Sequence, residues 1–218
     1  MVFKKSLILG LAISIVALMG FMAFEGQLVK AATDSFDVTL AVEGEISLNC
    51  PSATVALSPN ISGMTGGTAT ASLNCGVSTN NASGYNLAIH ATGSPAMIKD
   101  GDGTKTFDDA NTTPFYNWSG TVATDESKFG FAVSSSDAMQ AFKNNGSACN
   151  QGGGTASITN CFRGFNNTTD INIANGTTDT GVTPATTTIG FEAEVGATKN
   201  QATGNYRTTV IVTATTNG

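Results

Sequence analysis

Charge is scarce in this sequence. Only 12% of the 218 residues are Asp, Glu, Lys or Arg, and 16 acidic residues outnumber 10 basic ones, so the formal net charge is −6. An acidic surface that is poor in lysine repels phosphate backbones, which predicts that nucleic acid is not a partner. Thr, Ser, Asn, Gly and Ala fill the chain instead. Thr favours strands, whereas Gly and Asn favour turns, so this composition favours an extracellular all-β protein.

Residue types that support catalysis are equally scarce. The single histidine, His90, lies on the polar parity of an apolar–polar alternation, and no serine sits in a Gly-x-Ser-x-Gly elbow. Glu192 and Glu194 form a carboxylate pair, but they alternate with apolar residues and are interpreted as the polar side of a strand. No Cys-x2-Cys pair is present to hold zinc. We therefore expect a protein that is not an enzyme.

Long apolar runs are absent except near the start. Met1–Lys5 is basic, Ser6–Phe24 carries no charge, and Val29 and Ala31 are small residues suited to a cleavage site. This layout predicts a signal peptide over residues 1–31 and a secreted or cell-surface protein of residues 32–218 in one domain. Cleavage changes the net charge to about −8, because the segment holds three lysines and one glutamate. The alternative is an uncleaved membrane anchor over residues 6–24, since about 20 apolar residues span a bilayer.

Four cysteines in an exported chain predict two disulfides. Three pairings are available. Order along the chain favours Cys50 with Cys75, which would join two early strands, and Cys149 with Cys161, which would close a glycine-rich loop. Each is expected to stabilise the fold by about 3 kcal/mol.

Alternation of apolar and polar residues predicts a series of half-buried strands. The strands are expected at 36–42, 46–50, 66–79, 85–89, 129–133, 189–195 and 206–215, with shorter ones at 53–57, 162–165 and 171–173 and one helical turn within 137–143. This pattern is typical of an antiparallel, immunoglobulin-like β-sandwich, here with long loop insertions that make residues 91–188 loop-rich. The Val face of the last strand is expected to be buried.

Two loops carry candidate binding residues. Alternating carboxylates on a glycine-rich stretch suit calcium, and they are Asp100, Asp102, Asp108 and Asp109; the alternative is a solvated acidic turn. Tyr116 and Trp118 could stack on a sugar or a partner protein, whereas the alternative for the tryptophan is packing against the sandwich.

The mature N-terminus carries an alternating apolar series: Phe36, Val38, Leu40 and Val42. An extended segment of this kind can complete the sheet of a neighbouring molecule, with backbone bonds giving affinity and alternate side chains filling pockets. The alternative is an ordinary first strand in the chain's own sheet.

Two stretches resemble a known group of proteins. Ile46–Cys50 with Ala69–Ile89, and the ending Thr188–Asn217, resemble pilin-type β-sandwiches, among them fimbrial subunits and spore coat protein U-like domains, in which early-strand cysteines pair. They also resemble surface proteins of ultra-small, host-associated bacteria and, more distantly, WxL-type wall-binding domains. The resemblance implies a pilin-like fold at the cell surface.

Together these patterns predict a non-enzymatic structural or adhesive protein, such as a pilus- or coat-like subunit. Its partners would be other copies of itself or other cell-surface components, with a glycan as a further option and the membrane only through an uncleaved residues 6–24. The alternative is an extracellular carbohydrate- or calcium-binding recognition module.

Overall fold

The computed structural model describes residues 33–119, 121–165 and 169–218 and divides the chain into two units, Met1–Val42 and Glu43–Gly218. The predicted signal peptide lies outside the described residues. Within the first unit, residues 33–42 form no strand. The expectation of an ordinary first strand at 36–42 is therefore wrong for this structure. An alternating apolar segment gains nothing from an extended pairing unless a neighbouring strand offers it hydrogen bonds and a buried face.

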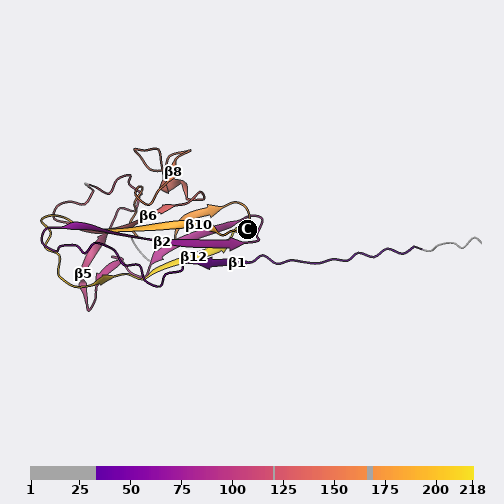
Figure 1. The fold of residues 1–218 in the computed structure, drawn as a ribbon, viewed down its shortest axis with the longest axis horizontal. Helices are drawn as coiled ribbons and strands as arrows, with labels where there is room; N and C mark the ends of the chain where they lie inside the picture. The colour runs from indigo at the N-terminus through magenta and orange to yellow at the C-terminus, as the bar shows by residue number, and fades with distance from the viewer. Residues whose placement is uncertain (1–32, 120, 166–168) are drawn as a thin grey trace, which may run out of the picture. The chain divides into compact units, whose positions relative to one another are not determined.

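The second unit is all-β, with two main sheets and a small hairpin (Figure 1). The larger sheet runs in the order β1-β2-β10-β6-β5-β4-β11, and the smaller in the order β12-β3-β9. The strands of the larger sheet are β1 (Ile46–Asn49), β2 (Gly67–Thr79), β10 (Ala185–Val195), β6 (Ser127–Ser134), β5 (Asp102–Asp109), β4 (Met97–Lys99) and β11 (Tyr206–Arg207). Those of the smaller sheet are β12 (Val210–Thr216), β3 (Tyr85–Ala91) and β9 (Ile171–Gly176).

Apart from 36–42, the long predicted strands are confirmed, and the arrangement is sandwich-like, but it is not wholly antiparallel. β5 pairs with β6 in parallel, so the larger sheet is mixed. Residues 91–188 also hold more strands than expected, including β5, because its polar residues hide the pattern. The remaining hairpin is β7 (Lys143–Asn144) with β8 (Thr155–Ala156), which follows a 3-10 turn, Gln140–Phe142, near the predicted helical turn. Two of the short predicted strands are wrong. Residues 53–57 are irregular, and no strand forms at 162–165, where single bridges join Phe162 to Phe115 and Arg163 to Phe131.

The final strand is divided between the two sheets. β11 pairs with β4 in the larger sheet, and after two residues β12 pairs with β3 in the smaller one. The end of β12 is held by Asn217, whose side-chain amide donates to the carbonyls of Ser83 and Gly176 at 2.9 and 2.8 Å. The C-terminal segment therefore ties the two layers together.

The core lies between the sheets, where inward side chains alternate along each strand. Tyr85, Leu87, Phe129, Phe131 and Ile189 are each no more than 1% exposed. A second, smaller cluster covers the outer face of β6 and consists of Ala110, Trp118, Val122, Ala132 and Phe162, with Phe115 packed against it. Much of the long insertion thus folds back onto the sheet.

Both predicted disulfides form: Cys50 is bonded to Cys75 and Cys149 to Cys161. The first joins the residue after β1 to the middle of β2, and the second fastens the loop after β7 to the segment after β8. Disulfides persist in oxidising compartments, so two of them are consistent with an extracytoplasmic protein. In the part of the chain that the structure describes, no helix has the length and apolar character required to cross a membrane.

Candidate functional sites: an interlayer groove and a polar pocket

A large apolar groove opens between the two sheets. We call it the interlayer groove; its volume is about 1520 Å³. Its apolar lining comes from β2 and β10 on one side, from β12 on the other, and from the irregular segment 51–61 and the loop 200–208 at its margins. Apolar side chains in this lining include Leu48, Val55, Leu57, Leu73, Phe107, Phe191, Tyr206, Val210 and Val212.

The core layer is incomplete along this groove. Val210, Val212 and Ala214 point to the inner side of β12, yet they are only half-buried, as are Leu48 and Leu73 on the facing sheet. The predicted burial of the Val face of the last strand is therefore only partial. Such apolar residues are normally buried in the protein interior. The groove therefore resembles a hydrophobic core from which one layer of side chains is missing.

Two strands beside the groove have unpaired edges. Within the described residues, β1 pairs with β2 alone and β12 pairs with β3 alone. The two edge strands lie near each other (Figure 1). A free strand edge presents a row of backbone N–H and C=O groups that can accept another strand. The groove therefore offers an apolar floor together with backbone hydrogen-bonding edges.

The loop at one margin of the groove is anchored to the core. The Gln201 side chain accepts a hydrogen bond from the Ser127 hydroxyl at 3.0 Å and donates to the Thr106 carbonyl at 3.1 Å. The Tyr206 hydroxyl donates to the Ala202 carbonyl at 2.7 Å, and its ring packs edge-on against Phe107. These contacts fix the wall formed by residues 200–206.

The predicted donor residues are exposed. Phe36, Val38, Leu40 and Val42 have exposed fractions between 78% and 87%. The segment that follows is held to the end of β2: the Asn80 amide donates to the Glu43 carbonyl at 3.0 Å and accepts the Glu45 N–H at 2.6 Å. The Thr79 hydroxyl donates to the Glu45 carbonyl at 2.7 Å. Residues 43–45 therefore continue β1 without making a turn.

The four aspartates of the predicted calcium loop are engaged separately. Asp100 pairs with Arg207, and Asp102 accepts hydrogen bonds from the backbone and hydroxyl of Thr104. Asp109 accepts the Ala96 N–H at 3.1 Å, and Asp108 is exposed on β5. No group of three or more His, Cys, Asp or Glu side chains in the described residues is placed to hold a metal ion. The calcium hypothesis therefore gains no support from this arrangement.

The two aromatic candidates differ in exposure. Trp118 is buried, with its ring edge-on to Phe162 and tilted against Phe115, so it packs over β6 as the structural alternative predicts. Gly130 makes this possible, because a Cβ there would lie 3.0 Å from the indole ring. Tyr116 is half-buried, and its binding role stays a prediction.

The carboxylates on the outer face of β10 are perturbed. Burial raises the pKa of Glu192 to about 7, and the charge of Glu194 adds to the rise. Burial also raises the pKa of Glu194, against an opposing effect of the Trp118 side chain. Lys128 lies opposite Glu194 in the sheet but pairs with Glu126 at 3.0 Å. His90, which we expected to face solvent, is partly buried and lies 2.6 Å from Asp170, measured from Nδ1 to Oδ1.

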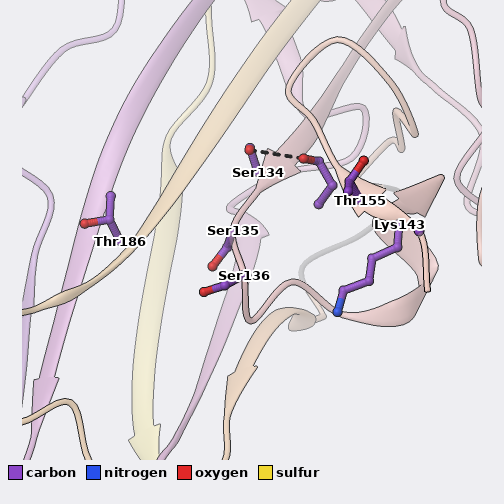
Figure 2. A pocket seen from close by; sticks show the side chains of 8 residues that line it. Ser134, Ser135, Ser136, Lys143, Thr155 and Thr186 are labelled. Carbon is purple, nitrogen blue, oxygen red and sulfur yellow. Dashed lines mark hydrogen bonds between the residues drawn. The ribbon is translucent and has the colours of Figure 1, made fainter. Parts of the chain in front are cut away.

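A second, smaller cavity of about 550 Å³ has polar walls (Figure 2). We call it the polar pocket; its lining residues are Ser134, Ser135, Ser136, Lys143, Gly154, Thr155, Ala156 and Thr186. The sequence did not predict this pocket, because its residues come from four separate segments and carry no motif. It missed the groove for a related reason: an apolar run such as 53–57 does not reveal that its partner layer is absent.

Among solved structures, the chain has a distant likeness to a fimbrial protein complex. A solved structure described as a chaperone–tip adhesin complex of CFA/I fimbriae biogenesis matches 79% of this chain and 42% of its own chain, with 13% sequence identity and a TM-score of 0.44. This chain thus spans less than half the length of that protein. No family model matches the sequence, and no curated protein matches it.

Proposed function

We propose that this protein is a non-enzymatic structural or adhesive subunit of the cell exterior, with a pilin-like sandwich, whose copies assemble by strand exchange. The segment around Phe36–Val42 of one copy would enter the interlayer groove of the next. The observation that carries the proposal is that the groove and the N-terminal segment are complementary. The groove lacks a layer of apolar side chains, and the same chain has an alternating apolar segment whose side chains are exposed.

The dimensions of the two parts agree. At about 3.3 Å per residue, the seven residues from Phe36 to Val42 extend over about 23 Å. The free edge of β12 also has seven residues, Val210–Thr216. Burying one Val, Leu or Phe side chain completely contributes about 1.5–3 kcal/mol. Four such side chains would contribute about 6–12 kcal/mol, which roughly offsets the cost of ordering seven residues at about 1–2 kcal/mol each. Backbone hydrogen bonds along the free strand edge would then provide the net stabilisation.

Exchange between copies is favoured over insertion of the chain's own segment. To enter its own groove beside β1, the segment would have to reverse at residues 43–45. The Asn80 and Thr79 hydrogen bonds instead hold these residues in line with β1. Reversal would break those bonds, whereas donation to a second copy would keep them.

Light scattering of the chain that starts at residue 32 tests the proposal, after refolding over a range of concentrations. We expect oligomers whose size grows with concentration. The double variant Phe36→Asp with Leu40→Asp should remain monomeric, because it would bury charges in the groove. The matched control is Ser35→Asp with Thr39→Asp, which adds the same charges on the opposite parity and should still assemble.

The proposal fails if the unmodified chain is monomeric at every concentration, or if the two double variants assemble equally. A peptide of residues 33–43 provides a second readout. Added to the monomeric variant, it should raise the melting temperature by occupying the empty groove. A peptide that carries the two aspartates should not.

A further inference from the structure

The polar pocket is separate from the groove and has a different chemistry. Its lining contains hydroxyl groups, backbone and one cation, and no carboxylate and no aromatic ring. In Figure 2, Lys143 reaches from the β7–β8 hairpin toward the Ser134–Ser136 segment that follows β6.

Lys143 is the charge that the pocket presents. Its side chain is partly buried, and within the described residues no carboxylate forms an ion pair with its ammonium group. By contrast, Lys128 and Arg207 each have an acidic partner. The lining itself holds no carboxylate, and the carboxylate of the neighbouring Asp137 accepts hydrogen bonds from the hydroxyl groups of Ser136 at 3.2 Å and Tyr85 at 2.8 Å. A half-buried ammonium group beside such a lining favours an anionic ligand, since a charged hydrogen bond is stronger than a neutral one.

The Ser136 hydroxyl donates its hydrogen to the Asp137 carboxylate at 3.2 Å, whereas the other serine hydroxyl groups of the pocket have capacity left for a ligand. The Ser135 hydroxyl accepts the Asp137 N–H at 3.1 Å, which leaves its own hydrogen available. The Ser134 hydroxyl donates to the Ala156 carbonyl at 3.2 Å and can still accept (Figure 2). Thr155 and Thr186 add exposed side chains at the rim. A ligand with several hydroxyl groups of its own would match this set of donors and acceptors.

The hairpin that carries Lys143 is held firmly. The buried Asn144 side chain donates to the Thr155 carbonyl at 2.9 Å and accepts the Gly146 N–H at 3.1 Å. The Gln151 N–H donates to the Lys143 carbonyl at 3.2 Å, and Cys149–Cys161 fastens the loop. A preorganised site spends less binding energy on ordering its side chains.

We infer that the polar pocket binds an acidic sugar, with the ligand carboxylate on Lys143 and ring hydroxyls on the serine and threonine side chains. A cavity of about 550 Å³ falls within the ordinary range for small-ligand sites. The absence of an aromatic ring for stacking disfavours neutral sugars, and the clustered hydroxyls disfavour a bare anion. The site would give the assembled surface a recognition function that does not depend on strand exchange.

NMR titration of the full chain carrying Phe36→Asp and Leu40→Asp, which keep it monomeric, tests this inference, with glucuronate, glucose and acetate as probes, each up to about 50 mM. Glucuronate should shift the amide signals of residues 134–136, 143, 154–156 and 186, with a dissociation constant in the millimolar range. Glucose and acetate should bind at least about tenfold more weakly, because glucose lacks the carboxylate and acetate lacks the ring hydroxyl groups. The same spectra report whether every variant remains folded.

Lys143→Gln should weaken glucuronate binding at least about tenfold, whereas the control Lys105→Gln, at an exposed position on β5, should leave it unchanged. Equal binding of acetate would show a simple anion site and overturn the inference. Equal binding of glucose, or no shifts with glucuronate, would overturn it as well. None of these outcomes depends on assembly, so the strand-exchange proposal stands or falls separately.

Discussion

The two sides of the sandwich differ in how completely their inward apolar side chains are buried. On the closed side, β6, β10, β3 and β9 bury Phe131, Ile189 and Ile173 completely. On the open side, β1 and β12 leave Leu48, Val210 and Val212 half-buried along the interlayer groove. Both sides use the same alternation of apolar and polar residues. The difference lies in what covers each strand. β9 is also an edge strand, but its outer edge is covered by residues 137–139, where the Met139 N–H donates to the Ile173 carbonyl at 2.9 Å and the Asn175 N–H donates to the Asp137 carbonyl at 2.8 Å. The edges of β1 and β12 have no such partner within the described residues.

The largest expected effect belongs to the closed side. Phe131→Ala removes a fully buried ring that packs against Phe142 and Phe165, and it should lower the free energy of unfolding by about 3–5 kcal/mol. Urea denaturation of the monomeric Phe36→Asp, Leu40→Asp background measures this loss. A decrease below about 1 kcal/mol would mean that this side is not the packed centre of the fold.

Loss of the Cys50–Cys75 disulfide should come next. This bond fastens the segment after β1, which borders the groove, to the buried middle of β2. The double variant Cys50→Ser with Cys75→Ser should lower the free energy of unfolding by about 3 kcal/mol, because the unfolded chain gains freedom. The same variant should also weaken binding of the 33–43 peptide to the groove. The control is the double variant Cys149→Ser with Cys161→Ser, which should also destabilise the chain but should leave binding of the 33–43 peptide unchanged.

Ionisation of Glu192 should make stability depend on pH. The folded pKa of about 7 exceeds the ordinary value of 4.5, so the folded state holds its proton more tightly than the unfolded state. The stability that this provides is complete below pH 4.5 and is lost as the pH rises through 7. Relative to the parent, Glu192→Gln should gain about 1 kcal/mol at pH 8, a figure reduced for partial exposure, and nothing at pH 4. A gain that is equal at both pH values would contradict the assignment.

The smallest effect in the monomer should come from the open side. Val212→Ala removes two methyl groups from a side chain that is only half-buried, so the monomer should lose about 1 kcal/mol or less. The same change should weaken binding of the 33–43 peptide, because the valine becomes fully buried only when the groove is filled. A loss in the monomer as large as that of Phe131→Ala would show that the groove is already closed.

The sequence pattern predicted much of the fold, and its errors have physical causes. Residues 85–89 and 189–195 were predicted well because alternation of apolar side chains follows directly from a half-buried strand. Asp102–Asp109 was missed as a strand because six of its eight residues are polar or charged, so burial leaves only Phe107 as a signal. Phe36–Val42 shows the reverse error: its alternation predicted a strand, but no strand forms because no neighbouring strand pairs with it within the described residues.

The candidate sites divide in the same way. The disulfide pairs followed from order along the chain, and the apolar parity of the N-terminal segment is visible in the letters alone. The aspartates of residues 100–109 looked like a ligand set, but Asp100, Asp102 and Asp109 each bind a different neighbour and Asp108 is exposed, because side-chain direction depends on strand pairing. Trp118 packs against β6 because Gly130, on that strand, has no side chain and leaves space for the indole ring.

By itself, the sequence determined the all-β class and favoured the observed pairing of the cysteines, since these depend on composition, local periodicity and order along the chain. Only the tertiary structure decided which strand edges remain free, where the apolar layer is incomplete and which polar residues gather around Lys143. Those features depend on contacts between segments far apart in the chain. A periodic pattern predicts which side chains favour burial, and only the packing of the two sheets shows which of them are buried.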